Sequence, residues 1–198
     1  MTPDLDLGRA VRALRTALAD EEVRAISRRY LVSNGFDGAL TSIGVAVGSF
    51  LTGVPTGLAV VKIGLGAAVG LATSGVWSVW EIERAEKRAE LADVERAMLR
   101  DLSGTRLHRE QRTARAVNAV ASGLGPVAGV LLPMTPYLMA PSIGLLWATV
   151  AAVGVGVGVL FAFGSYVGTT AGLNPYVAGA RMGVAGLVVA VVNYLLPG

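Results

Sequence analysis

The sequence contains no cysteine and a single histidine, His108, among its 198 residues. Without cysteine, disulfides, thiolate metal sites and thiol catalysis are excluded, and one histidine excludes a multi-histidine metal site within one chain. No pairing of a nucleophile with a base is recognisable, because the histidine lies in a charged segment and no acid accompanies a serine. The sequence therefore does not indicate an enzyme.

Charge is also scarce. Charged residues make up 16% of the chain, hydrophobic residues 53%, and the mean hydropathy is +0.59, whereas a soluble domain carries roughly 25% charged residues. The apolar residues are concentrated in blocks, which is typical of a protein that crosses the membrane several times. Phenylalanine is rare, with four residues, whereas glycine is abundant, with 26. Small residues let membrane helices approach closely, so the composition favours a tightly packed helical bundle.

The apolar blocks predict an all-α integral membrane protein with five transmembrane helices. Each block has the roughly 20 residues that a helix needs to cross a hydrocarbon core about 30 Å thick. The predicted spans are 30–53, 57–80, 116–139, 143–166 and 177–196. These define four segments, namely an amphipathic N-terminal helix in 1–29, spans one and two in 30–80, a charged helical extension in 81–115, and spans three to five in 116–198.

Basic residues predict the orientation. Of the seventeen Lys and Arg residues, sixteen lie in the N-terminal segment, in 81–115 or at Arg181, and the exception is Lys62. With five spans these sixteen fall on one side, which the positive-inside rule places in the cytoplasm. We therefore expect a multi-pass membrane protein, of the cell membrane if prokaryotic, with a cytoplasmic N-terminus and an external C-terminus. The same rule explains the net charge of +3 without a nucleic-acid partner.

Asp37 is the one acidic residue outside the two charged segments, among fourteen in the chain. An ionised carboxylate in hydrocarbon costs about 2.5–3.5 kcal/mol on insertion scales, so it normally faces a cavity, a partner or an ion pathway. Asn34 and Thr41 lie at helical spacing from it, and their oxygens suit a divalent metal or a proton. Gly35 and Gly38 would permit a local distortion or a close neighbouring helix. The alternative is a protonated aspartate bonded to a neighbouring helix.

Acidic residues recur in the extension that follows span two. Glu83, Glu86 and Glu90 have the spacing of one helical face, and Glu95 follows. Clustered carboxylates are what hard divalent ions need, and a bound cation would relieve their repulsion. The alternative is a solvated helix face with weak ion pairs, such as Glu83 with Lys87.

Taken together, these motifs resemble the vacuolar iron transporter family, and its small prokaryotic members in particular. The likeness covers nearly the whole chain. It rests on Asn34-Gly-Phe-Asp37-Gly-Ala-Leu in span one, the Glu-rich stretch 81–98, Leu99 to His108, Pro133-Met-Thr-Pro136 and Gly164-Ser-Tyr-Val-Gly168.

The resemblance implies a five-helix protomer, a homodimer whose first spans line a central path, and export of Fe²⁺, Mn²⁺ or similar ions from the cytosol in exchange for protons. The metal is then a transported substrate, and no resident cofactor is implied. Asp37 matches the pore aspartate of the family, and Glu83, Glu86, Glu90 and Glu95 fall in its acidic, metal-binding helix.

One departure from the family pattern lies in span two. Better-known members carry an acid and a methionine there, whereas this span has neither before Glu81 and offers hydroxyl oxygens such as that of Ser74. Two alternatives therefore stay open: a transporter of another cation, and a non-transporting membrane protein whose charged cytoplasmic segment recruits a partner.

Overall fold

The computed structural model describes residues 7–99 and 106–196, and in these ranges the chain is helical with no strand. The first six residues of the predicted N-terminal segment, and residues 100–105 of the predicted extension, lie outside the described residues. The helices are α1 (Leu7–Ala19), α2 (Glu21–Leu51), α3 (Gly57–Met98), α4 (Arg106–Met134), the 3₁₀ helix η1 (Thr135–Met139), α5 (Ala140–Ile143), α6 (Leu145–Thr170) and α7 (Pro175–Leu195).

The N-terminal helix ends at Ala19, directly before Asp20. The extended backbone of this residue interrupts the helix, and its carboxylate accepts hydrogen bonds from the N–H groups of Glu22 and Val23, at 2.9 and 3.3 Å. Such a cap starts a new helix. Helix α2 therefore begins at Glu21, and residues 21–29 belong to the same helix as the first predicted span. The predicted boundary at residue 30 does not separate two elements.

Helix α3 continues without a break from the second predicted span through Met98, so residues 81–98 of the predicted extension are helical, whereas residues 106–115 belong to α4. The 42 residues of α3 correspond to about 63 Å at 1.5 Å per residue. A hydrocarbon core is about 30 Å thick, so roughly half of α3 must lie beyond it.

Helix α4 ends next to a proline. The α-helix stops at Met134, directly after Pro133, and the chain turns through η1 and α5 before α6 begins at Leu145. A proline inside a helix removes a backbone hydrogen bond and clashes with the preceding turn. The last two predicted spans, 143–166 and 177–196, correspond to α6 and α7 with shifts of a few residues.

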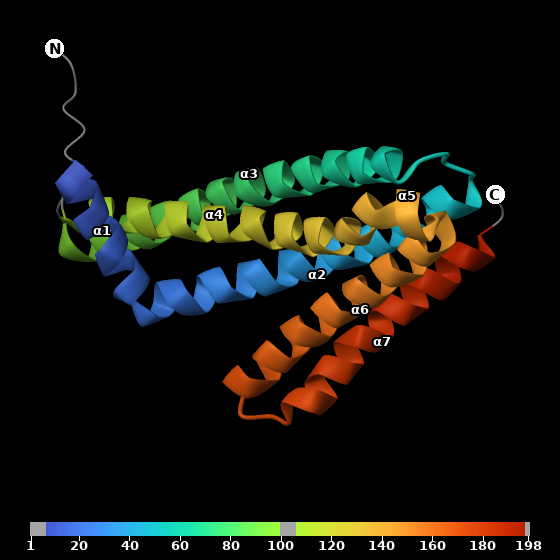
Figure 1. Ribbon diagram of the computed structural model, residues 1–198. Coiled ribbons are helices and arrows are strands. Elements are labelled where there is room, and N and C mark those ends of the chain that lie inside the picture. Colours follow the sequence, from blue (N-terminus) through green and yellow to red (C-terminus); the bar gives the residue numbers. More distant parts are fainter. Residues whose placement is uncertain (1–6, 100–105, 197–198) are drawn as a thin grey trace, which may run out of the picture.

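The helices form an elongated bundle (Figure 1) in which α2 and α4, α3 and α4, and α6 and α7 pack most extensively. One buried cluster joins α2, α3, α4 and α6 around Tyr137, whose hydroxyl donates to the Ala46 carbonyl at 3.3 Å and pairs with the Thr149 hydroxyl at 2.9 Å. A second joins α2 to α6 and α7 around Ile43 and Leu160. The α6–α7 pair diverges from α2 toward the end of the bundle that carries α1.

Glycines allow α2 and α4 to cross in backbone contact. A Cβ atom added to Gly129 would lie 2.4 Å from the Gly35 carbonyl oxygen, and one added to Gly38 would lie 2.7 Å from the Pro126 carbonyl oxygen. The sequence left open whether Gly35 and Gly38 permit a distortion or a close neighbour. Because α2 remains α-helical through both positions, these glycines permit the close approach of α4 and not a distortion of α2.

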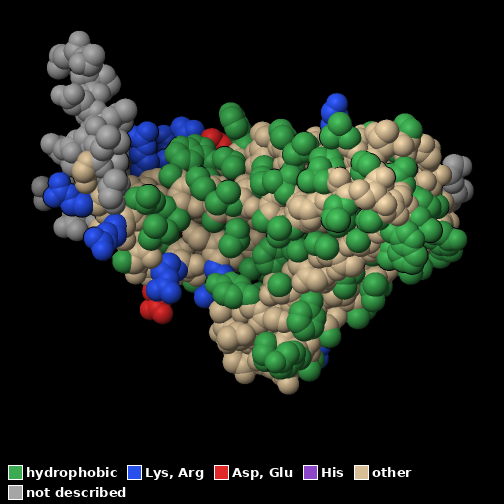
Figure 2. Space-filling view, in the orientation of Figure 1, with side chains coloured by type: hydrophobic (Ala, Val, Ile, Leu, Met, Phe, Trp, Pro, Cys, Tyr) green, Lys and Arg blue, Asp and Glu red, His purple; other side chains and the backbone are tan. Residues whose placement is uncertain are grey.

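Among the described residues, four stretches are long and apolar enough to cross a membrane by length and composition: Gly57–Met98, Gln111–Ile143, Leu145–Thr170 and Pro175–Leu195. Helix α2, which holds the first predicted span, is not among them, so the predicted count of five is not confirmed. Figure 2 shows hydrophobic side chains over much of the body, while most of the visible Lys and Arg side chains gather at the end that carries α1. Such a surface is typical of a protein embedded in a bilayer.

Candidate functional site

Asp37 lies near the middle of α2 with its side chain exposed, on the side of the helix that faces away from α4. Its neighbours Gly35 and Gly38 are buried in the crossing with α4, whereas Ser33, one turn earlier, is exposed like Asp37. Within the described residues, Asp37 makes no hydrogen bond or ion pair. In the described part of the protomer, Asp37 therefore has no bond to a neighbouring helix that would support the alternative of a bonded aspartate.

The other predicted pathway residues do not all accompany Asp37. Asn34 is turned toward α4, where its amide donates to the hydroxyl and the carbonyl of Ser122, at 2.5 and 3.3 Å. Thr41 is half-buried one turn beyond Asp37 on α2, and Ser74 is exposed on α3. In a single protomer the structure therefore places Asp37 on an open face and gives Asn34 a packing contact of its own.

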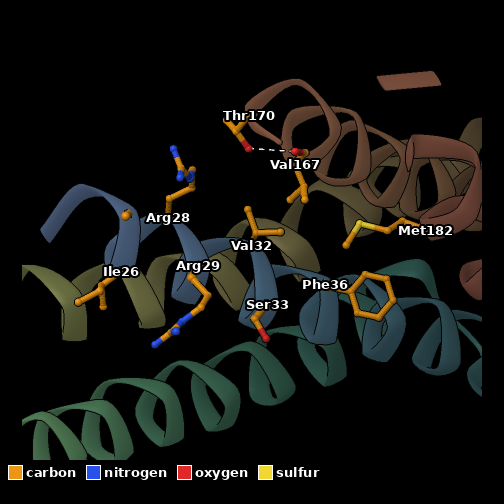
Figure 3. A pocket seen from close by; sticks show the side chains of 10 residues that line it. Ile26, Arg28, Arg29, Val32, Ser33, Phe36, Val167, Thr170 and Met182 are labelled. Carbon is orange, nitrogen blue, oxygen red and sulfur yellow. Dashed lines mark hydrogen bonds between the residues drawn. The ribbon is translucent and has the colours of Figure 1, made fainter. Parts of the chain in front are cut away.

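An open cavity of about 570 Å³ lies between the first half of α2 and the diverging α6–α7 pair (Figure 3). Its lining runs along α2 from Ala25 to Phe36, the residue before Asp37, and its wall is mainly apolar, with Phe36 from α2, Val167 from α6 and Met182 from α7. Arg28 and Arg29 lie at its α1 end and point in different directions. The cavity thus reaches from the charged end of the molecule to Phe36, next to Asp37 on α2.

The four predicted acidic ligands are not brought together. Glu83 is buried, 3% exposed, and accepts a hydrogen bond of 3.4 Å from the Tyr30 hydroxyl of α2. Glu86 and Glu90 are exposed and Glu95 is half-buried. Within the described residues, no group of three or more acidic, histidine or cysteine side chains is placed to hold a metal ion. Their role as metal ligands stays a prediction.

Lys87 organises the charges around this part of α3, beyond its apolar half. Its ammonium lies 2.9 Å from the Glu90 carboxylate and 3.8 Å from that of Glu22 at the start of α2. The hydrogen bond with Glu90 raises the pKa of Lys87 above its ordinary value, and the charges of Glu22 and Glu83 act in the same direction. The sequence had suggested Glu83 as the partner of Lys87, but the ion pairs of Lys87 are with Glu90 and Glu22.

A ladder of polar contacts along α2 was missed by the sequence analysis. Ser27 donates to the Asn118 side chain at 2.7 Å, Tyr30 contacts Glu83, and Asn34 contacts Ser122. The first and third rungs reach α4 and the second reaches α3. The signal was present, because residues 27, 30 and 34 have helical spacing on α2, and residues 118 and 122 have it on α4.

Comparison with known proteins gives a family. The profile of the VIT family matches residues 77–197, which is more than half of the chain and begins near the end of the apolar part of α3. The chain is also 22% identical, over 171 residues, to the uncharacterized protein MJ0645 of Methanocaldococcus jannaschii, with 85% of this chain and 87% of that protein covered. No solved structure matches the chain. The extent of the profile match shows that this chain belongs to the VIT family.

Proposed function

We propose that this protein transports a divalent cation of the Fe²⁺ or Mn²⁺ kind out of the cytosol in exchange for protons. The single observation that carries the proposal is the exposed, unpaired carboxylate of Asp37 in the middle of α2, described above. Membership of the VIT family, a family of metal ion transporters, supports the same function.

A partner surface should cover Asp37. Exposing an ionised carboxylate to lipid is unfavourable, and such groups face a bundle interior or a water-filled path. Ser33 and Gly48 lie on the same side of α2 as Asp37, and a Cβ atom added to Gly48 would meet nothing within 4 Å, whereas one added to Gly44 would lie 3.6 Å from the Asn193 side chain of α7. A row of small residues permits close approach of a second helix. We therefore propose a homodimer in which the two α2 helices face each other and the two Asp37 side chains line one path.

The dimer requires α2 to be the fifth membrane span. Its polar residues, Asn34 and Asp37 among them, make it less apolar than the other four, which is expected of a helix that lines a path and contacts little lipid. With α2 included, the basic residues of α1, α2 and the far half of α3 lie on one side, and the positive-inside rule makes that side cytoplasmic.

The chemistry follows from what a carboxylate can bind. Asp37 can hold either a proton or a cation, and the attraction of a nearby cation lowers its proton affinity, so that the two compete for one site. We propose that the cytoplasmic acids Glu83, Glu86, Glu90 and Glu95 raise the local concentration of the ion. Glu86 and Glu90 are exposed and would meet it first. The ion would then reach Asp37, with Asn34, Thr41 and Ser74 as further oxygen donors along the path.

Transport in liposomes tests this proposal. We expect purified protein to carry Fe²⁺, Mn²⁺ or Co²⁺ across the membrane, and a pH gradient to increase the flux. Asp37→Asn should reduce the flux to that of protein-free liposomes. The matched control is Asp93→Asn, which removes an exposed acid that pairs with Arg96 on α3 and should leave the flux unchanged. Wild-type flux in Asp37→Asn would refute the role of this carboxylate.

A second candidate is transport of another cation, monovalent or organic. Two observations favour it: the described residues contain no three-acid cluster, and α3 has no acid before Glu81. The same liposomes distinguish the two candidates. Flux of K⁺ or of a quaternary ammonium ion that depends on Asp37, with no flux of divalent ions, would assign the path to the other cation.

A further inference from the structure

Basic side chains from two helices converge where α3 and α4 leave the apolar part of the bundle. They surround a small cavity of about 40 Å³, which is room for roughly three water molecules at 10–15 Å³ each. We call it the arginine pocket, and it is lined by Arg84, Lys87, Arg88 and Leu91 of α3 and Gln111, Arg112 and Arg115 of α4.

The arginine pocket has more positive than negative charge. Lys87 is paired with Glu90 and Glu22, and Arg84 lies 3.5 Å from Glu81. Arg88, Arg112 and Arg115 form no ion pair with an acid in the part of the chain that the structure describes. Three guanidinium groups that line one small cavity repel one another, and a bound anion would offset that repulsion.

Arg115 also has an unused donor. Its guanidinium lies over the Trp80 ring, 4.3 Å from the ring centroid, which fixes its position. Its Nε atom is buried and finds no hydrogen-bond acceptor among the described residues. A buried donor without an acceptor is unfavourable, so an acceptor oxygen from outside the protein would stabilise this arrangement.

The depth of the arginine pocket in the membrane suggests the source of that oxygen. Trp77 and Trp80 close the apolar half of α3, and tryptophan is enriched at the level of lipid headgroups. Arg84 follows Trp80 by one turn, and Arg115 is the last charged residue before the apolar stretch of α4. The arginine pocket thus begins at headgroup depth.

We propose that the arginine pocket binds the phosphate of an anionic membrane phospholipid. The planar, forked guanidinium matches phosphate oxygens through two parallel hydrogen bonds, and basic pockets between membrane helices recognise such headgroups. The positive-inside rule explains an excess of Lys and Arg on this side, but it does not require five of them to line one cavity. The proposal does not depend on the transported ion.

Native mass spectrometry of the full-length protein in detergent tests the proposal. We expect the wild type to retain phosphatidylglycerol in preference to phosphatidylcholine. Arg88→Gln combined with Arg112→Gln should lower this preference roughly thirtyfold, because two juxtamembrane cations are lost. The matched control combines Arg24→Gln with Arg181→Gln, two exposed cations on α2 and α7, and should behave as the wild type.

The competitors distinguish the possible sources of phosphate. Inorganic phosphate and glycerol phosphate, each at the concentration of the lipid, should not displace phosphatidylglycerol. Should the pocket variant fail to fold, Gln111→Glu places a carboxylate in the arginine pocket and should lower retention in the same way. Equal retention of both lipids, equal loss in the pocket and control variants, or displacement by soluble phosphate would overturn the proposal.

Discussion

At the scale of single residues, Asn34 and Asp37 are only three residues apart on α2, yet one is packed against another helix and the other is exposed. Asn34 faces α4 and bonds to Ser122, whereas Asp37 faces away from it. Both residues fit a helical stripe of oxygen donors, which is how the sequence grouped them. The spacing along α2 does not show where α4 packs. The close crossing of α2 and α4 determines which of the two side chains is enclosed.

The contact between Asn34 and Ser122 provides a stability prediction. In Asn34→Ala the buried hydroxyl and carbonyl of Ser122 lose their donor, and leaving such groups unsatisfied costs about 1–3 kcal/mol. We expect a lower unfolding temperature in detergent, followed by circular dichroism. Ser33→Ala, a change at the neighbouring exposed position, should have little effect. Equal melting of the two variants would show that the contact contributes no stability.

Glu83 illustrates a second limit of the sequence at this scale. The spacing of Glu83, Glu86 and Glu90 correctly indicates a helix, and that helix is α3. It could not indicate that Glu83 is buried against Tyr30 while the other two are exposed. That difference arises because α2 runs beside α3 at Glu83, and a helix pattern contains no information about the neighbour.

At the scale of helices, the crossing of α2 and α4 depends on glycine. The sequence has 26 glycines, and composition alone predicted close packing without showing which of them lie at the contacts. The structure separates them: Gly125 and Gly129 face the backbone of α2, whereas Gly154 and Gly158 have open space around them. The sequence also contains a signal for the break at Asp20, since aspartate is a preferred N-cap.

Substitution of Gly129 tests this crossing. In Gly129→Ala the new methyl group would lie 2.4 Å from the Gly35 carbonyl oxygen and 2.8 Å from the Ala39 nitrogen. Both are backbone atoms, so the helices must move apart, and overpacking of this kind costs about 1–3 kcal/mol. We expect a lower unfolding temperature for Gly129→Ala. The unfolding temperature of Gly154→Ala should not change, because a Cβ atom there meets nothing within 4 Å. A Gly129→Ala variant as stable as Gly154→Ala would contradict the crossing.

At the scale of the whole molecule, the sequence predicted the helical membrane class and most helix positions, because long apolar runs are a strong signal. It did not predict that α6 and α7 diverge from α2 around a cavity of about 570 Å³, nor that basic residues of α3 and α4 share one pocket. Both features depend on which helices become neighbours. Which helices pack together depends on how well their whole faces fit, and each single residue contributes little to that fit.

The orientation in the membrane is a property of the whole molecule that the missing cysteines make easy to test. Because the native chain has no cysteine, a single introduced thiol is the only one that a membrane-impermeant maleimide can label. Arg24 and Thr52 lie at opposite ends of α2, and Ala171 lies in the turn between α6 and α7, all three exposed. Labelling at these positions shows whether α2 crosses the membrane and on which side of the membrane each end of α2 lies.

In intact cells we expect the maleimide to label Thr52→Cys and to leave Arg24→Cys and Ala171→Cys unlabelled until the membrane is opened. The reason is the positive-inside rule, which places the basic ends of α1, α2 and α3 in the cytoplasm. The unsubstituted chain is the control and should take up no label. Labelling of Arg24→Cys and Thr52→Cys from the same side would show that α2 does not cross the membrane, and Asp37 could then not line a path through it. Labelling of Arg24→Cys and Ala171→Cys from outside, without labelling of Thr52→Cys, would keep the path but reverse the direction in which the acidic half of α3 could deliver an ion.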